Sequence, residues 1–399
     1  MTDQAQDPSK KSEKGFFSVP FDFVVVGEKL PYDLYVNSSS RPEHERFVRV
    51  FPKDELMDRA TITKMRSKYF QIYVIEDQRA IYLNSLVKSD QVSDENKTKV
   101  IKDSAINYLA GLVDHTQGFR PELLVETIDN CKEAVQSMVT VIKDYRVSDL
   151  HEMIAKLSFH DFYTYDHSIN VSMYCVTIYK TYKQKILKES VSDDELITIG
   201  MGGLLHDLGK LKLPTSILNN PGKLSVAEFE EVKQHPRYGL EMLNEARIRM
   251  ENRGKQVDFD IVSKMIYEHH ENFDSSGYPQ KLKGDTISES ARITAIADFF
   301  DAITTKRSYS EVLSLEAAID VMGHSRGKKI DPNLFAVFLT SLKKLSLPNR
   351  NRVEVPADFD PSQPHEKIPL IEVSVSKPSA NFGKVVVQED NQKKDKEKK

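Results

Sequence analysis

The stretch that decides the fold is Gly202-Gly-Leu-Leu-His-Asp-Leu-Gly-Lys210, an apolar segment that ends in a histidine, an aspartate and a lysine. The pattern predicts a helix that brings His206 and Asp207 to its end. A carboxylate can bridge two cations while imidazoles fill the outer positions. Lys210 follows His206 by four residues, so both project from nearly the same face. An ammonium beside two cations is costly unless an anion lies between them, which indicates a phosphate-containing ligand; the alternative is a lysine that ends the helix and faces water.

Further imidazoles and carboxylates lie on both sides of this stretch. The chain carries His167 before it and, after it, His235, the pair His269-His270, and Asp298. No structural role requires such a set. Imidazoles and carboxylates without thiolates are typical ligands of iron, manganese or zinc in hydrolytic sites. The set therefore predicts a metal-dependent site that hydrolyses a phosphate compound.

Two features of this set constrain where it lies. Neighbouring helical residues diverge by about 100°, so His269 and His270 face one site only near a helix end, or when each serves a different ion. The glycines that follow and Pro279 supply such an end. Asp298 lies on the buried face of its predicted helix, where a carboxylate needs a partner or a metal. Asp301, one turn further on, competes for that role.

The composition sets the class of protein. The chain has 399 residues, of which 29% are charged, and a formal net charge of -4; it lacks the basic excess that nucleic-acid binding requires, so we expect no DNA partner. Cys131 and Cys175 fall in apolar helical patterns, which argues against a disulfide framework. Because we find neither a signal peptide nor a run of about 18 apolar residues, we expect a cytoplasmic protein without a transmembrane segment.

The sequence predicts a multidomain chain, with a small N-terminal α+β module followed by an all-α helical bundle. We expect a disordered leader at 1–15, a sensory or docking module at 16–88, a helical connector at 89–147, the bundle at 148–347 and a disordered charged tail at 348–399. A purely structural role for the module, as a cap on the next domain, is equally well supported. Its expected helix lies within Asp54–Arg66, and its candidate strands are Phe23–Val26, Asp33–Val36, Phe47–Val50, Ile72–Ile75 and Ala80–Leu83.

The second helix of the expected connector carries an apolar seam with heptad spacing. Its members are Leu124, Ile128, Cys131, Val135, Met138 and Ile142. Such a seam is typical of a coiled coil that joins two chains or transmits a signal. It is equally typical of an amphipathic helix packed on its own domain. Because the seam lasts for fewer than three heptads, the packed helix is favoured, and a homodimer through the connector stays the alternative.

Six motifs, taken together, resemble one protein family. They are H-D-L-G-K (206–210), N-P-G-K-L-S (220–225), H-P-R-Y-G (235–239), H-H-E-N-F-D-S-S-G-Y-P (269–279), D-F-F-D-A-I-T-T-K-R (298–307) and D-P (331–332). In order and spacing they resemble the HD-GYP family, the bacterial phosphodiesterases that open the cyclic dinucleotide cyclic di-GMP. The resemblance covers roughly residues 148–347 and implies an HD-type helical bundle there. It does not extend to the N-terminal module or to the tail.

The resemblance implies a role for individual residues. Two divalent ions are implied, iron or manganese first and zinc or nickel as alternatives, and their ligands would be His167, His206, Asp207, His235, His269, His270 and Asp298. Lys210 matches the family's substrate-phosphate lysine, and Tyr278 and Arg307 match positions that contact the dinucleotide. Asp207, as the bridging ligand, and Lys210 are the catalytic candidates. The implied mechanism is attack on phosphorus by a hydroxide that bridges the two ions, while the ions and Lys210 stabilise the charge on the non-bridging oxygens.

Three positions depart from the family's pattern. Tyr163 stands where some members place a glutamate that binds a third metal, so we expect two ions. Ser275 replaces a common glycine, which would stiffen or reshape its loop. Ser310 stands where many members carry a second basic residue after Arg307, and this change removes one phosphate contact and predicts weaker affinity.

The function expected from these features is hydrolysis of cyclic di-GMP to pGpG, with GMP as a further product, in bacterial second-messenger signalling. The alternative is a receptor or scaffold that binds the dinucleotide in the same pocket with little turnover, and Ser275, Ser308 and Ser310 favour it. A third hypothesis is another phosphohydrolase substrate, although the Gly-Tyr-Pro segment favours a cyclic dinucleotide. In the family this segment is also linked to contacts with diguanylate cyclases, so GGDEF proteins are an implied partner.

Overall fold

Two compact units make up the part of the chain that the computed structural model describes, which is residues 15–39, 45–114, 118–157, 163–218, 224–250, 257–305 and 313–342. The first unit runs to Ser93 and the second begins at Asp94. The expected tail, and all of the expected leader except residue 15, lie outside the described residues. Over the described ranges, no helix is both long and apolar enough to cross a membrane.

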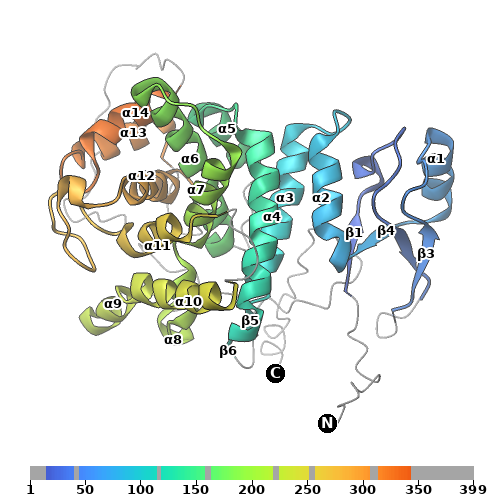
Figure 1. Cartoon of the computed structure of the whole chain (residues 1–399), viewed down its shortest axis with the longest axis horizontal. Coiled ribbons are helices and arrows are strands. Elements are labelled where there is room, and N and C mark those ends of the chain that lie inside the picture. The colour runs from blue at the N-terminus through green and yellow to red at the C-terminus, as the bar shows by residue number, and fades with distance from the viewer. Residues whose placement is uncertain are drawn as a thin grey trace, which may run out of the picture. The chain divides into compact units, whose positions relative to one another are not determined.

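The first unit is built on a four-stranded antiparallel sheet. Its strands are β1 (Phe16–Val19), β2 (Leu34–Asn37), β3 (Phe47–Phe51) and β4 (Ile72–Ile75), in the order β1-β4-β2-β3 (Figure 1). Two helices accompany the sheet, α1 (Arg59–Lys68) and α2 (Arg79–Lys88). Asp58 begins α1, because its side chain accepts a hydrogen bond from the backbone nitrogen of Thr61. The predicted α+β module is confirmed.

Two of the five expected strands are wrong. Ala80–Leu83 belongs to α2, whose buried residues recur with helical spacing while Ile81 is 43% exposed. Phe23–Val26 overlaps a 3-10 turn and pairs with no strand in the described part of the unit. Instead the side-chain amide of Gln91 accepts from the nitrogen of Val26 (3.0 Å) and donates to its carbonyl oxygen (2.6 Å). A side chain thus satisfies the backbone groups that a neighbouring strand would otherwise bond.

The second unit is helical, as expected. A short hairpin of β5 (Val113–Asp114) and β6 (Gly118–Phe119) lies between its first two helices in sequence. The helices are α3 (Asp94–Ala110), α4 (Leu124–Ile142), α5 (Val147–Leu157), α6 (Tyr163–Thr181), α7 (Asp193–Leu205), α8 (Thr215–Leu218), α9 (Val226–Val232), α10 (His235–Met250), α11 (Phe259–Glu268), α12 (Glu289–Thr304), α13 (Leu315–His324) and α14 (Pro332–Thr340).

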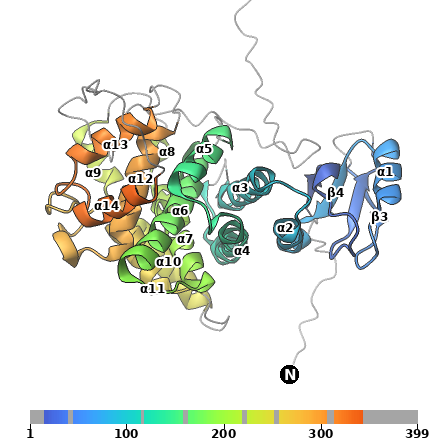
Figure 2. The same ribbon diagram turned by 90° about the horizontal axis from the view of Figure 1, so that it is seen from above.

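Helices α6 and α7 form the centre of the second unit. They lie side by side, and α11 and α12 pack against them (Figures 1 and 2). Gly203 allows the two central helices to approach closely, because a Cβ atom at this position would lie 2.7 Å from the Cα atom of Ser172 on α6. Ser192 and Glu195 form a capping box that begins α7. The packing fixes the C-terminal end of α7, where His206 and Asp207 follow.

The expected connector is not separate from the helical bundle. Helices α3 and α4 pack against α6 and α7 within the same compact unit. The six seam residues of α4 are all buried within the single chain, none more than 2% exposed. Of the two interpretations of the heptad spacing, the structure supports the amphipathic helix packed on its own domain. The seam therefore offers no surface through which a second copy could dimerise.

Candidate metal centre

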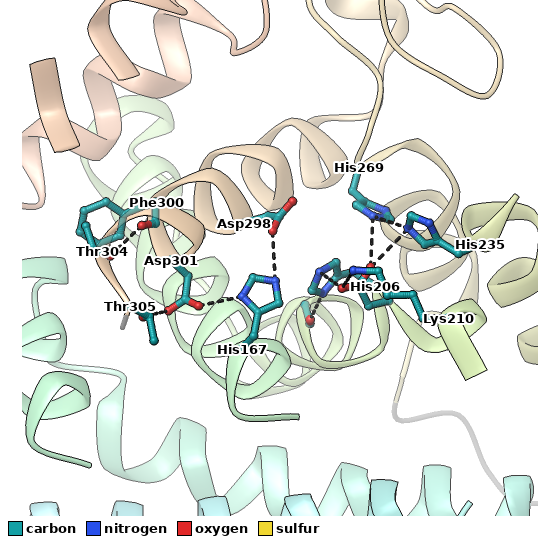
Figure 3. Close-up of polar contacts among 12 residues, drawn as sticks. His167, His206, Lys210, His235, His269, Asp298, Phe300, Asp301, Thr304 and Thr305 are labelled. Carbon is teal, nitrogen blue, oxygen red and sulfur yellow. Dashed lines mark hydrogen bonds and ion pairs between the residues drawn. The ribbon is translucent and has the colours of Figure 1, made fainter. Parts of the chain in front are cut away.

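The predicted metal ligands come together where helices of the second unit meet. His206 follows the last residue of α7, His269 follows the last residue of α11, and His235 is the first residue of α10. His167 lies on α6 and Asp298 on α12 (Figure 3). The pair at 269 and 270 thus lies beyond a helix end, as the sequence predicts for two neighbours that face one site.

Three of the imidazole rings are oriented by hydrogen bonds of the same kind. In His206, His235 and His269, Nδ1 lies 2.7, 2.7 and 2.9 Å from the carbonyl oxygen of the residue three positions earlier. A carbonyl oxygen only accepts, so Nδ1 carries the hydrogen and Nε2 keeps its lone pair. Contacts of this kind fix the tautomer and the orientation of metal-binding histidines.

His167 is aimed by a carboxylate rather than by a carbonyl group. Its Nδ1 lies 2.7 Å from Oδ2 of Asp301, and its Nε2 lies 3.1 Å from Oδ1 of Asp298. Asp301 is completely buried and also accepts a hydrogen bond from the Thr305 hydroxyl at 2.7 Å (Figure 3). The two aspartates that compete in the sequence therefore have different roles. Asp301 orients the ring, and Asp298 faces the nitrogen that remains for a metal.

Asp207 belongs to one group of ligand atoms and also contacts a second group. Within each group the ligand atoms lie no more than 4.8 Å from one another. The first group consists of Asp207, His235, His269 and His270, and the second consists of His167, His206 and Asp298. Oδ1 of Asp207 is 3.3 Å from Nε2 of His235, and Oδ2 is 3.3 Å from Nε2 of His206. Asp207 can thus serve both groups, as a ligand shared by two ions would.

The donor set fits divalent ions. Oδ1 of Asp207 is buried and has no hydrogen-bond donor in the described part of the chain. Nε2 of His235 lies 3.3 Å from Nε2 of His269, and both nitrogens carry lone pairs because each Nδ1 hydrogen is bonded to a carbonyl group. Two lone pairs at this separation repel each other unless a cation lies between them. A divalent cation held by His235 and His269 would remove this repulsion.

Burial and charge set the protonation of these ligands for metal binding. Burial lowers the pKa of His269 to about 3, and it also holds the pKa of His270 well below its usual range. Burial alone would raise the pKa of Asp207. The neighbouring charge of Lys210 leads the effects that outweigh it and hold the pKa of this carboxyl well below its usual range. Neutral imidazoles and an ionised carboxylate are the forms that bind metals.

His167 differs from the other histidines and gives the metal-free protein a pH dependence. Burial alone would lower its pKa, but the hydrogen bonds to Asp298 and Asp301 outweigh it and raise the pKa to about 9, from an ordinary value of 6.5. The folded state therefore holds this proton more tightly than the unfolded state, so the stabilisation is full below pH 6.5 and is lost as the pH rises through 9. We expect chelator-treated protein to lose about 3 kcal/mol of unfolding free energy over this range. Urea denaturation at several pH values measures the loss.

The control for this prediction is His167→Gln, which removes the titrating group and should flatten the pH dependence between pH 6.5 and 9. The lowered pKa of His269 acts only below pH 6.5 and does not contribute in this window. A slope that survives in the variant would show that another group is responsible.

The predicted substrate residues lie beside the ligand groups wherever the structure describes them. Nζ of Lys210 lies 2.5 Å from Oδ2 of Asp207. The ring of Tyr278 stacks on that of His270, with centroids 4.8 Å apart. Arg307 and the serines at 308 and 310 lie outside the described residues, and so does the side chain of Tyr163.

A pocket opens beside the two ligand groups. It is lined by His270 from one group and Asp298 from the other, together with Asn272, Phe299 and Lys329. The pocket therefore borders a residue of each ligand group. It also carries a cationic side chain, from Lys329, that the sequence analysis does not single out.

The loop that carries Tyr278 is held by a residue that the sequence analysis misses. The carboxylate of Glu271, 2% exposed, accepts hydrogen bonds from the backbone nitrogens of Gln280 (2.6 Å) and Leu282 (2.9 Å). Burial raises the pKa of this carboxyl above its ordinary value, against the effect of these bonds. The sequence offered one indication of this role, because Glu271 directly follows the histidine pair.

Ser275 adopts a left-handed backbone with φ +77°, which explains why a glycine suits this position. The conformation costs a residue with a side chain about 1–2 kcal/mol. We expect Ser275→Gly to raise the unfolding free energy by up to about 1 kcal/mol, the remainder offset by the greater chain entropy of glycine in the unfolded state. Denaturation midpoints measure the gain.

Ser276→Gly is the matched control for Ser275→Gly. It should destabilise the protein, because the Ser276 hydroxyl accepts a hydrogen bond from Asn272. Equal gains in stability in both variants would contradict the explanation.

Gly209 lets the turn after α7 pack closely against the start of α10. A Cβ atom at this position would lie 1.9 Å from the carbonyl oxygen of His235 and 2.4 Å from the nitrogen of Gly239. Only a residue without a side chain lets the turn after α7 press against the start of α10, and this contact places Asp207 beside His235. The glycine is visible in the sequence within H-D-L-G-K, but its neighbours in space are not.

Comparisons with known proteins agree with this geometry. The family model described as "HD domain" matches residues 150–334. The chain is 39% identical over 156 residues to the "Cyclic di-GMP phosphodiesterase response regulator RpfG" of Xanthomonas campestris, covering 39% of each chain. It is 35% identical over 173 residues to the "3'3'-cGAMP-specific phosphodiesterase 2" of Vibrio cholerae, covering 43% of this chain and 30% of that one. It is 31% identical over 186 residues to a "Cyclic di-GMP phosphodiesterase" of Thermotoga maritima, covering 46% and 48%.

The chain spans less than half the length of each of these relatives. The residues that match the HD domain, 150–334, include every predicted metal ligand from His167 to Asp298 as well as the Gly-Tyr-Pro segment. Residues 150–334 thus match the HD domain, and their motifs and similarity to proteins named as cyclic di-GMP phosphodiesterases support an HD-GYP domain there.

Proposed function

We propose that the chain is a metal-dependent phosphodiesterase that hydrolyses a cyclic dinucleotide, with cyclic di-GMP as the first candidate. The observation that carries this proposal is Asp207, which belongs to one group of metal ligands, contacts the second and has the ammonium of Lys210 2.5 Å away. Two of the relatives are named for cyclic di-GMP and one for 3'3'-cGAMP. Both dinucleotides therefore belong in the test.

The site residues have distinct tasks in this reaction. Two divalent ions held by the two groups, iron or manganese first, would supply Lewis acidity to the phosphate and lower the pKa of a water molecule. Asp207 serves as the shared ligand and stays ionised because it is surrounded by Lys210 and imidazoles. Lys210 binds a non-bridging oxygen of the scissile phosphate. The negatively charged phosphate then lies between the ammonium group and the divalent ions, so the positive charges do not face one another. Tyr278, stacked on His270 at the pocket, contacts the dinucleotide.

Turnover by the metal-loaded protein tests the proposal. The chain is purified without oxygen and loaded with ferrous iron or manganese, metal per chain is measured, and both dinucleotides are followed by chromatography. We expect about two ions per chain and a linear dinucleotide, pGpG from cyclic di-GMP, as the first product, with GMP later. Two ions with saturable dinucleotide binding and no product would instead make the protein a receptor. Hydrolysis of other phosphate esters alone would overturn the substrate class.

Lys210→Ala should separate substrate handling from metal binding. We expect metal content to stay unchanged and kcat to fall about 10²–10³-fold, the usual cost of losing one group that stabilises the transition-state charge. Lys212→Ala is the matched control, because Lys212 belongs to the same 3-10 turn and its nearest acid is Glu241, at 3.7 Å. A Lys210→Ala protein without metal would show that the lysine supports the ligands and not the substrate.

A further inference from the structure

Lys102 on α3 places a cation in the interior of the second unit. Its side chain is 0% exposed, and its Nζ lies 2.6 Å from Oδ1 of Asp166 and 3.0 Å from Oδ1 of Asn170, both on α6. A lysine is almost never fully buried unless it is paired, because removing an ion from water is costly. A buried ion pair is often no more stabilising than apolar residues of similar volume. Stability alone therefore does not explain why the charge lies here.

The two partners of Lys102 lie on both sides of a metal ligand in the sequence. Asp166 precedes His167 directly, and Asn170 follows it by three residues. Asp166 and Asn170 are four residues apart, so they lie one above the other on one side of α6. A single ammonium that pairs with Asp166 and donates a hydrogen bond to Asn170 constrains how α6 can rotate about its own axis at this level. The imidazole of His167 is fixed from a second direction by Asp301 at 2.7 Å.

Lys102 lies outside every segment that carries the family resemblance. Residues 150–334 match the HD domain, whereas α3 spans Asp94–Ala110. The helix nevertheless packs against α6 and α4 within the same unit. The environment of His167 thus includes a helix that the family's motifs do not contain.

We propose that Lys102 is a positioning residue for His167, so that the group formed by His167, His206 and Asp298 binds its ion only when α3 is correctly packed. The proposal rests on the metal binding proposed above. Without the ammonium, Asp166 is a buried carboxylate that has lost its cation, and α6 shifts to compensate. The group at Asp207 takes no ligand from α6 and keeps its geometry.

The test uses the full chain with Lys102→Met, which keeps the length of the side chain and removes its charge. After loading with manganese, ions per chain are counted by mass spectrometry, and both dissociation constants are measured by competition with a chelator. We expect one ion to bind about 10-fold more weakly, the lower end of the effect of losing a direct outer contact of a metal ligand, because Lys102 acts through the neighbours of His167; the other ion should bind as before.

A matched control comes from the other end of the same helix. Lys180 also lies on α6, and its Nζ is 2.8 Å from Oδ1 of Asp144. Lys180→Met removes a cation from α6 far from His167 in sequence, and it should leave both dissociation constants unchanged. If it weakens the same ion as Lys102→Met does, general loosening of α6 is the cause and the proposal is wrong.

A double variant separates positioning from packing. Lys102→Met combined with Asp166→Leu removes both charges, so the denaturation midpoint should recover relative to the single variant. If Lys102 positions His167, the weakened ion stays weak although the midpoint recovers. If the weakened dissociation constant recovers with the midpoint, Lys102 only supports the fold. A wild-type chain that binds no ions would overturn the metal centre itself, whereas two ions with an unchanged Lys102→Met variant would overturn only the role of Lys102.

Discussion

Asp207→Asn is expected to release ions from both ligand groups and to lower turnover of the metal-loaded protein about 10³-fold. The two oxygens of Asp207 lie 3.3 Å from Nε2 of His235 and of His206, one in each group. An amide keeps the size of the side chain but loses the charge and turns one ligand atom into a donor, so neither group stays complete. A metal supplies several kcal/mol of transition-state stabilisation, and each 1.36 kcal/mol is a factor of ten in rate.

Metal per chain and initial rates, measured on the same preparation, check this prediction. Asp193→Asn is the control, because Asp193 begins the same helix, α7, and its side chain is 63% exposed. The control should keep its metal and its rate. A variant at 207 that retains two ions but loses turnover would show a catalytic carboxylate that is not a shared ligand, and one that retains both would contradict its assignment altogether.

Gly209→Ala is expected to disrupt the centre without touching a ligand. The new Cβ atom would lie 1.9 Å from the carbonyl oxygen of His235, and a backbone atom cannot swing aside as a side chain can. The turn after α7 must therefore separate from α10, which carries Asp207 away from His235. Forcing extra volume into a packed interior costs about 1–3 kcal/mol, and we expect most of the bound metal to be lost as well.

The control for Gly209→Ala is a second glycine-to-alanine change in the same unit. Gly323 lies on α13, and a Cβ atom there would meet nothing within 4 Å. Alanine suits a helix better than glycine by up to about 1 kcal/mol, so Gly323→Ala should keep its metal and match or exceed the wild-type midpoint. Chemical denaturation and metal analysis measure both variants. A Gly209→Ala protein with wild-type metal content would show that the turn can move without disturbing the ligands.

The candidate site could be predicted from the sequence as far as its ligand types, because each ligand lies in a recognisable motif. The assignment within α12 could not be predicted. Asp298 and Asp301 are three residues apart on one helix, and their separate roles depend on which nitrogen of His167 each one faces. The same limit applies to Lys102, whose partner Asp166 is 64 residues away in the chain. Such contacts follow from helix packing, which the local pattern does not contain.

For the fold too, features set by a local sequence pattern could be predicted, and features set by distant contacts could not. The long helices of the second unit were predicted because their apolar period extends over several turns. The strands of the first unit contain four or five residues, too few to distinguish the two-residue repeat of a strand from the 3.6-residue repeat of a helix. Ala80–Leu83 was therefore mistaken for a strand, and β1 (Phe16–Val19), with almost every residue apolar, was not recognised at the edge of the sheet. The heptad seam of α4 was visible, but only the structure shows which helices cover it.

The hydrogen bonds that aim the imidazoles also complete the helices around them. The carbonyl groups of Gly203, Val232 and Ile266 belong to the last turns of α7, α9 and α11, where helix carbonyls lack partners of their own. Each ring satisfies one of them through the nitrogen that does not face the metal. Because these bonds do not involve an ion, we expect the helix ends to persist when metal is removed, unlike in small zinc domains whose folding requires the metal. We therefore expect the identity of the bound ions to follow the supply of metals around the protein.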